Sequence, residues 1–142
     1  MVRIEVYTGA AERICGFAAE GHSGFAPYGE DIVCAAISVL LQTAILGLEK
    51  VARVIPEVIV GDGRLDCHLP KEQAGNQEVD AILQTMLLGL EAIQAEYGDY
   101  VSVERIETKA PSALDGVFLG QSGGGAIDVD ESATVCQEKG SR

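Results

Sequence analysis

Residues 31–49 read DIVCAAISVLLQTAILGLE, and this stretch decides the fold. Between Asp31 and Glu49 the chain runs for 17 residues without a charge. A membrane-spanning helix needs about 20 predominantly apolar residues, so the run predicts a buried helix in a soluble protein. Asp is a favoured N-cap residue and proline ends helices. We therefore expect a helix from Asp31 to about Arg53, ahead of Pro56.

Alternating apolar residues and turn signals predict strands on both sides of this helix. Val2 begins a period-two pattern, Asp62-Gly63 marks a hairpin turn, and Asn76 caps a helix whose apolar positions follow 3.6-residue spacing up to Gly98. Small apolar residues fall on both faces of the second strand, which suggests that something packs on each side. The expected elements are strands at 2–7 and 12–20, the helix above, strands at 58–60 and 64–69, a helix at 77–97 and a strand at 100–107.

This order, β-β-α-β-β-α-β, predicts an α+β fold in two layers. Two helices should pack on a mostly antiparallel five-stranded sheet. Composition changes near residue 110, after which Phe118 is the single aromatic residue and a run of three glycines occurs. We therefore expect one domain at 1–109 and a flexible, Gly-rich acidic C-terminal tail at 110–142. Within the tail, 117–119 and 126–129 are apolar enough to dock as an extra edge strand.

The charge balance excludes some partners and favours others. The 22 acidic and 10 basic residues give a net charge of −12, of which −3 falls on residues 110–142. A general nucleic-acid binder needs clustered Lys and Arg to release counterions, so we expect no direct nucleic-acid binding. A negative field attracts basic peptides. Glu20, Glu30 and Asp31 flank the loop at 21–30, where a basic substrate would then be favoured.

The cysteine pattern points away from metal and cofactor sites. The four cysteines form no CxxC pair or metal-ligand ladder, and no dinucleotide or P-loop fingerprint occurs, so we expect no metal and no cofactor. Residues 1–6 show no secretory signal, which makes the cytoplasm the expected compartment and reduced thiols the expected state. Cys67 and His68 are neighbours in a strand and should point to opposite faces. We expect Cys15 in the core and Cys136 as an exposed thiol.

Cys34 is the strongest candidate for chemistry. It lies in the first turn of the predicted helix, where the helix dipole favours an anion and can stabilise a thiolate. Backbone N–H groups there, including that of Cys34, are natural donors to an oxyanion. His22 lies on the loop GHSGFAPYGE at 21–30, within folding reach as a base. The alternative is a buried cysteine acting as a small hydrophobe, with a loop histidine facing solvent.

The sequence allows two roles for each of two further residues, Asp31 and Ser38. Asp31 either caps the helix or faces His22 and holds its imidazolium; beside a thiolate, its charge would raise the cysteine pKa. Ser38 lies one turn after Cys34 on the same helix face. Its hydroxyl either orients a bound peptide or bonds back to the helix carbonyl one turn earlier.

The run from Gly21 to Leu40, with Gly21-His22-Ser23-Gly24 followed by YGEDIVCAAISVL at 28–40, resembles the ribosomal-processing cysteine protease Prp family. The resemblance covers about 20 contiguous residues and keeps the spacing between His22 and Cys34. It implies that Cys34 is the nucleophile and His22 its base. Asp31 and Ser38 match positions associated with the family's active site. Independently of the resemblance, the three glycines around His22, Gly21, Gly24 and Gly29, make the loop at 21–30 a candidate lid that orders on substrate binding.

The resemblance also implies an activity and partners. Family members are cytoplasmic homodimers that remove an N-terminal extension from the large-subunit ribosomal protein numbered twenty-seven during ribosome assembly. The expected function is therefore that of a cysteine endopeptidase with a Cys-His dyad, acting on a basic ribosomal protein. The alternatives are a non-catalytic ribosome-assembly module that binds the same peptide and, less favoured, a thiol redox sensor. The tail at 110–142 extends beyond the usual family length, so the resemblance assigns it no role.

Overall fold

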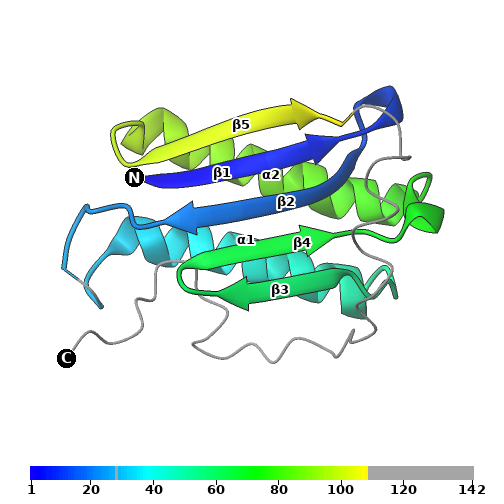
Figure 1. The fold of residues 1–142 in the computed structure, drawn as a ribbon, viewed down its shortest axis with the longest axis horizontal. Helices are drawn as coiled ribbons and strands as arrows, with labels where there is room; N and C mark the ends of the chain where they lie inside the picture. Colours follow the sequence, from blue (N-terminus) through cyan, green and yellow to red (C-terminus); the bar gives the residue numbers. More distant parts are fainter. Residues whose placement is uncertain (28, 109–142) are drawn as a thin grey trace.

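The secondary-structure elements follow one another in the predicted order. The computed structural model describes residues 1–27 and 29–108 (Figure 1). Two short 3-10 helices, Ala10–Glu12 and Lys71–Gln73, lie in connections between the main elements. These main elements are β1 (Val2–Thr8), β2 (Ile14–Gly21), α1 (Ile32–Lys50), β3 (Glu57–Gly61), β4 (Arg64–His68), α2 (Gln77–Tyr97) and β5 (Val101–Glu107).

The five strands form one mixed sheet in the order β3-β4-β2-β1-β5. Neighbouring strands run antiparallel, except that β5 pairs in parallel with β1. The parallel pair follows from the connection, because α2 carries the chain back along the sheet before β5 begins. The predicted α+β architecture, with a mostly antiparallel five-stranded sheet, is confirmed.

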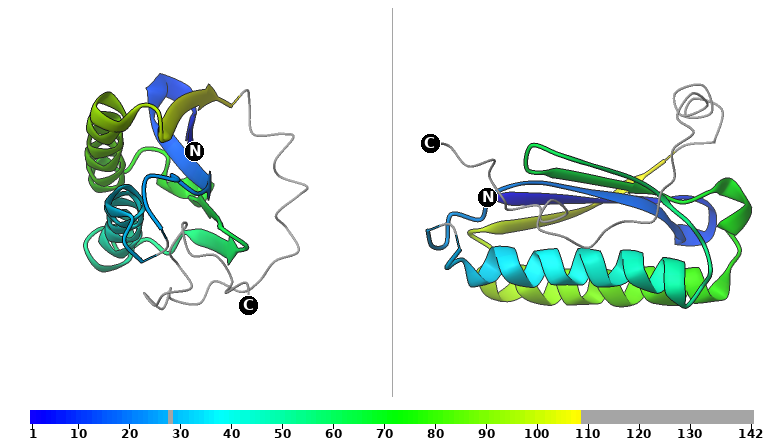
Figure 2. Two further views of the ribbon diagram at one scale, coloured as in Figure 1. Left: turned by 90° about the vertical axis from the view of Figure 1, so that its left-hand side faces the viewer. Right: turned by 90° about the horizontal axis from the view of Figure 1, so that it is seen from below.

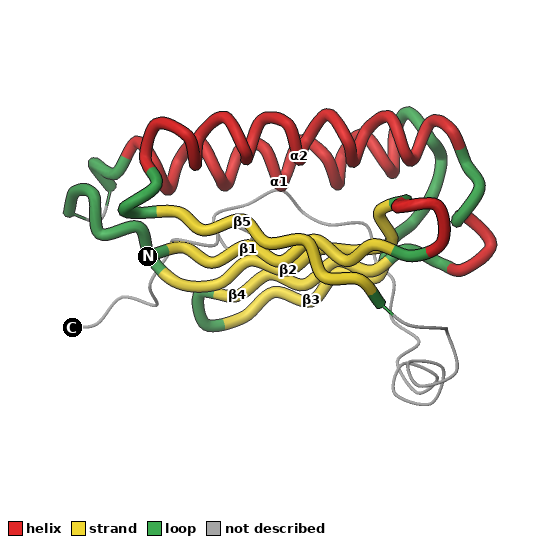
Figure 3. Tube along the Cα trace, turned by 90° about the horizontal axis from the view of Figure 1, so that it is seen from above, coloured by secondary structure: helices red, strands yellow, loops and turns green. Residues whose placement is uncertain are grey.

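Both helices cover the same face of the sheet (Figure 2, Figure 3). Alternation along β1 places Val2, Ile4 and Val6 on that face, where all three are fully buried. The two helices approach each other closely at Gly47 and Gly89. A β-carbon on Gly89 would lie 3.0 Å from a Leu40 methyl group. Apart from the fully buried Phe17, the core is aliphatic, and its largest fully buried helical side chains are Ile37, Leu41, Ile45, Leu48, Leu83, Leu87 and Leu90.

Helix α1 is long and apolar enough to cross a membrane by length and composition alone. A core helix of a soluble protein passes the same test, and eight residues of α1 are buried in this fold. The helix begins at Ile32 with Asp31 as its N-cap, as predicted. It ends at Lys50, a few residues before the predicted end, and the chain then turns through a left-handed Arg53 with φ 57°.

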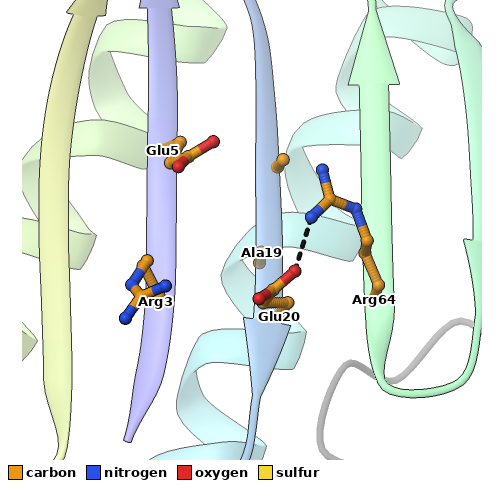
Figure 4. Close-up of a pocket in the computed structure, with 6 residues that line it drawn as sticks. Arg3, Glu5, Ala19, Glu20 and Arg64 are labelled. Carbon is orange, nitrogen blue, oxygen red and sulfur yellow. Dashed lines mark hydrogen bonds and ion pairs between the residues drawn. The ribbon is translucent and has the colours of Figure 1, made fainter.

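The other face of the sheet differs from the prediction. Small residues on both faces of β2 suggested packing on each side, but no described helix or strand covers this face. Ala18 is nevertheless 3% exposed there. Charged side chains surround it instead: Arg64 reaches across from β4 to Glu20 (Figure 4). Arg64 also pairs with Asp66 on its own strand. A shallow charged pocket results, lined by Arg3, Glu5, Ala18, Ala19, Glu20 and Arg64.

Two predictions concern the start of β2 and the tail. The strand begins at Ile14 instead of residue 12, because Ala11 and Glu12 adopt positive φ values of 58° and 57° that a strand does not allow. The tail at 110–142 lies outside the described residues, and so does Cys136. The predictions of a flexible tail, of docking by 117–119 or 126–129, and of an exposed Cys136 thiol remain predictions.

Candidate active site

Cys34 occupies the first turn of α1, and Asp31 holds the end of that helix. Asp31 has an extended backbone and its Oδ1 accepts a hydrogen bond from the Cys34 N–H at 2.9 Å. The Cys34 side chain is 7% exposed. Of the two roles considered for Asp31, the structure shows the helix cap. It also corrects one expectation, because the Cys34 N–H that was expected to hold an oxyanion already donates to Asp31.

Ser23 joins this group, and sequence reasoning did not select it. Its side chain is 4% exposed. The hydroxyl donates a short hydrogen bond to Oδ2 of Asp31 and accepts one from the Phe25 N–H at 3.2 Å. Its oxygen lies 3.5 Å from the sulfur of Cys34. A serine that follows a candidate base directly and precedes a glycine-rich turn was the available signal.

The surroundings of Asp31 favour its ionised form. Burial by itself would raise the pKa of this carboxyl, but hydrogen bonds from the Ser23 hydroxyl and the backbone N–H groups of Cys34, Ala26 and Val33 outweigh burial and lower it. An anionic carboxylate therefore sits at the helix start, close to the cysteine sulfur. Its negative charge opposes the formation of a second negative charge on Cys34.

His22 lies at the junction between β2 and the loop, directly before Ser23, and is half-buried. Neighbouring Cα atoms are about 3.8 Å apart, so the contact between Ser23 and Cys34 also brings the backbone of His22 to the start of α1. Gly21 makes this turn possible. Its φ is +97°, and a β-carbon there would lie 2.6 Å from the Met1 carbonyl oxygen.

The loop after His22 connects β2 to α1 (Figure 1). It bends through two further left-handed glycines and is held in place by an aromatic contact. Gly24 and Gly29 have φ values of +70° and +86°, a region that other residues adopt with strain. Phe25 packs edge-on against Tyr97 and Tyr100, with ring centroids 5.6 and 5.3 Å apart. The loop is thereby attached to the C-terminal end of α2.

Ser38 is 4% exposed, and its hydroxyl makes no hydrogen bond with any of the described residues. The bond back to the helix carbonyl one turn earlier, which was one of its two expected roles, is therefore not formed. An unsatisfied buried hydroxyl costs free energy. Its position one turn after Cys34 leaves it able to bond a group that binds beside the sulfur.

Two further cysteines lie in the described part of the chain. Cys15 and Cys67 are free thiols. Burial raises the pKa of the Cys67 thiol, which keeps it protonated. Its neighbour His68 lies on the opposite face, where it stacks on Tyr7, so the predicted separation of Cys67 from His68 is confirmed.

Residues 1–27 and 29–108 contain no cluster of three or more His, Cys, Asp or Glu side chains that could hold a metal ion. The charged pocket over Ala18 lies on the sheet face opposite the helices, away from Cys34. Its Arg64 is paired with carboxylates on two strands.

Comparisons with known proteins agree on one family. The family model described as cysteine protease Prp matches residues 1–102. The ribosomal processing cysteine protease Prp of Staphylococcus aureus is 27% identical over 101 residues, which are 71% of this chain and 95% of the relative. The protein of the same name from Bacillus subtilis is 24% identical over 107 residues, with 72% and 96% covered.

Solved structures share the fold. One is a crystal structure of an essential ribosomal processing protease Prp from S. aureus, in complex with a covalently linked product peptide. It has a TM-score of 0.71 and 25% identity, and the match covers 75% of this chain and all of the other. A protein of Streptococcus mutans has a TM-score of 0.69 at 22% identity, with 76% and 96% covered, and shows the fold alone.

Proposed function

We propose an endopeptidase function for this chain, which belongs to the cysteine protease Prp family. The substrate that we propose is the large-subunit ribosomal protein numbered twenty-seven, from which the enzyme removes an N-terminal extension during ribosome assembly. The observation that carries the proposal is the position of Cys34: nearly buried in the first turn of α1, beside Ser23 and Asp31. The enzyme acts in the cytoplasm, as a homodimer, without a cofactor or direct nucleic-acid contact.

In this mechanism His22 and Cys34 form the catalytic dyad. His22 takes the thiol proton of Cys34, and the thiolate sulfur forms a bond to the scissile carbonyl carbon. The tetrahedral intermediate collapses as the C–N bond breaks, and His22 gives its proton to the leaving amine. Water then hydrolyses the thioester with His22 as base, which releases the acid and restores the thiol. The family's bound product peptide in S. aureus Prp supports a peptide as the substrate class.

Asp31 and Ser38 support this chemistry in different ways. Asp31 fixes the helix start that carries Cys34. Ser38 offers its unsatisfied hydroxyl to the substrate or the thiolate one turn away. The loop that contains Gly21, Gly24 and Gly29 acts as a lid, because their left-handed conformations let the chain fold over the start of α1.

The acidic residues that flank the loop contribute less to substrate attraction than the sequence suggested. Of the three acidic residues that flank the loop, Glu20 pairs with Arg64 and Asp31 is used within the fold. Glu30 remains exposed. The net charge of −12 therefore acts as a field over the whole molecule, and we expect kcat/KM for a basic substrate to fall with rising salt.

The test uses the reduced full chain and a ribosomal protein carrying its N-terminal extension, followed by intact-mass measurement. The wild type should release one N-terminal fragment, and Cys34→Ala and His22→Ala should release none. Cys15→Ala removes a free thiol near the start of β2 and should cleave normally. Cleavage by Cys34→Ala would refute the proposed nucleophile. Retained binding without cleavage by the wild type would instead support the non-catalytic module.

A thiol redox sensor is the second candidate, since Cys34 lies in the first turn of α1, a position that can hold a reactive thiol. The two functions separate when the protein is reduced. A protease gains turnover on reduction, whereas a sensor changes the oxidation state of Cys34 with peroxide and never cleaves a peptide. Size-exclusion chromatography with light scattering tests the proposed homodimer independently.

A further inference from the structure

The hydroxyl of Ser23 links the helix cap Asp31 to the proposed nucleophile Cys34. Its oxygen is held in place by the Phe25 N–H at 3.2 Å. Its hydrogen points to Asp31 Oδ2, and its oxygen lies 3.5 Å from the Cys34 sulfur. The side chain is almost fully buried, so water has little access to replace any of these contacts.

One hydroxyl has a single hydrogen to donate. While Cys34 carries its proton, the thiol can donate to the Ser23 oxygen and the Ser23 hydrogen can remain on Asp31. Once a thiolate forms, the same oxygen would present lone pairs to a negative sulfur, which is repulsive. Rotation about the Cβ–Oγ bond removes this repulsion, because it turns the hydrogen toward the sulfur without moving the oxygen.

Asp31 can release this hydrogen bond without becoming unsatisfied. Its Oδ1 keeps the Cys34 N–H at 2.9 Å, and its Oδ2 keeps the Ala26 N–H at 3.4 Å. The rotation therefore exchanges one hydrogen bond to an anion for another, and both kinds are stronger than bonds between neutral groups. The Phe25 N–H remains as the donor that fixes the Ser23 oxygen.

We infer that Ser23 is a positioning residue whose hydroxyl donates to Asp31 in the resting enzyme and to the Cys34 sulfur in the thiolate form. The inference rests on the proposed role of Cys34 as nucleophile. The Asp31 carboxyl and the Cys34 thiol contact this hydroxyl, and the titratable residue His22 precedes Ser23 in the chain. Tyr97 belongs to α2, whose end meets the loop through Phe25.

The test measures the rate at which iodoacetamide alkylates Cys34 in the reduced full chain across pH, read from the mass of the peptide that contains Cys34. Loss of a donor to the thiolate in Ser23→Ala should raise the apparent pKa of Cys34 by about one unit. Alkylation near neutral pH should then slow roughly tenfold. Ser23→Thr, which keeps a hydroxyl, should restore much of the wild-type profile. Ser102→Ala removes a hydroxyl from β5 and should change nothing.

A Ser23→Ala profile that superimposes on the wild type, or that shifts to lower pH, would overturn the inference. If Ser23→Ala does not fold, Ser23→Thr and Ser23→Val give the same comparison with side chains of equal size. Alkylation requires no peptide cleavage, so this readout is separate from the proposed function. A chain that never cleaves the ribosomal protein but shows the shift retains the Ser23 inference and loses the protease assignment.

With a cleavable peptide as substrate, kcat and KM are measured separately for the same variants. A positioning role in thiolate formation predicts that Ser23→Ala lowers kcat at neutral pH, leaves KM nearly unchanged, and recovers at higher pH. A role limited to holding the loop predicts a loss that does not recover with pH. That second result would also count against the inference.

Discussion

Asp31 should stabilise the fold and oppose the thiolate at once, so its removal should move two measurements in opposite directions. Losing a side-chain N-cap costs about 1 kcal/mol. Asp31→Ala also leaves the buried Ser23 hydroxyl without its acceptor, which adds about 1–2 kcal/mol. We therefore expect Asp31→Ala to lower the free energy of unfolding by about 2–3 kcal/mol, or Tm by on the order of 10 °C.

The effect on Cys34 follows from distance. The bond between Asp31 and Ser23 and the 3.5 Å contact between Ser23 and Cys34 together place a carboxylate oxygen within about 6 Å of the sulfur. At an effective dielectric constant of ~20, two charges at this separation repel by roughly 3 kcal/mol, an upper limit near two pKa units. Asp31→Asn keeps a good cap and removes the charge, so the Cys34 pKa should fall by about 1–2 units.

Denaturant unfolding and the iodoacetamide profile of the reduced protein measure the two effects. The pKa of Asp31 is lowered on folding, so its stabilising contribution is complete above about pH 4 and disappears as pH falls through that lowered pKa. The stability gap between wild type and Asp31→Ala should narrow accordingly in acid. Asp66→Asn removes a carboxylate paired on β4 and serves as the control. A Cys34 pKa that rises in Asp31→Asn would refute the electrostatic argument.

Two further outcomes follow from other contacts. Burial lowers the pKa of His68, so the unfolded chain binds its proton first and stability should decline as pH falls below about 6.5; His68→Gln should flatten this dependence in unfolding curves, and an unchanged slope would contradict it. Phe25→Ala removes two edge-on ring contacts, each worth about 0.5–1.5 kcal/mol, and should speed proteinase K cleavage in the loop and lower Tm by on the order of 5 °C; equal cleavage would mean that Phe25 does not hold the loop.

The parts of this fold that can be predicted are those whose secondary structure is determined by residues close together in the sequence. The uncharged run after Asp31 specified α1, and the cap was foreseen because Asp competes well for the first N–H groups of a helix. The alternation from Val2 specified β1. The ends were less accurate: Arg53 and Glu12 take left-handed conformations, and non-glycine residues give little sequence signal for these.

Long-range placement explains what was missed. Ser23 reaches Asp31 and Cys34 across 8 and 11 residues, and its position depends on Gly21, whose backbone passes the Met1 carbonyl too closely for any side chain. Glycine allows many turns, so the sequence does not show which one is used. The charged side chains beside Ala18 were missed for a related reason, because Glu20 and Arg64 meet only when β2 and β4 pair.

The start of α1 also limits how its nucleophile can be activated. A helix N-terminus carries roughly half a positive charge, while the ionised Asp31 beside it carries a full negative charge. The helix dipole is therefore outweighed at this end, and position in the first turn cannot by itself make Cys34 a thiolate. Activation must come from donors outside the helix. In the proposed mechanism these are the imidazolium of His22 and the hydroxyl of Ser23, two adjacent residues placed at the helix start by the turn at Gly21.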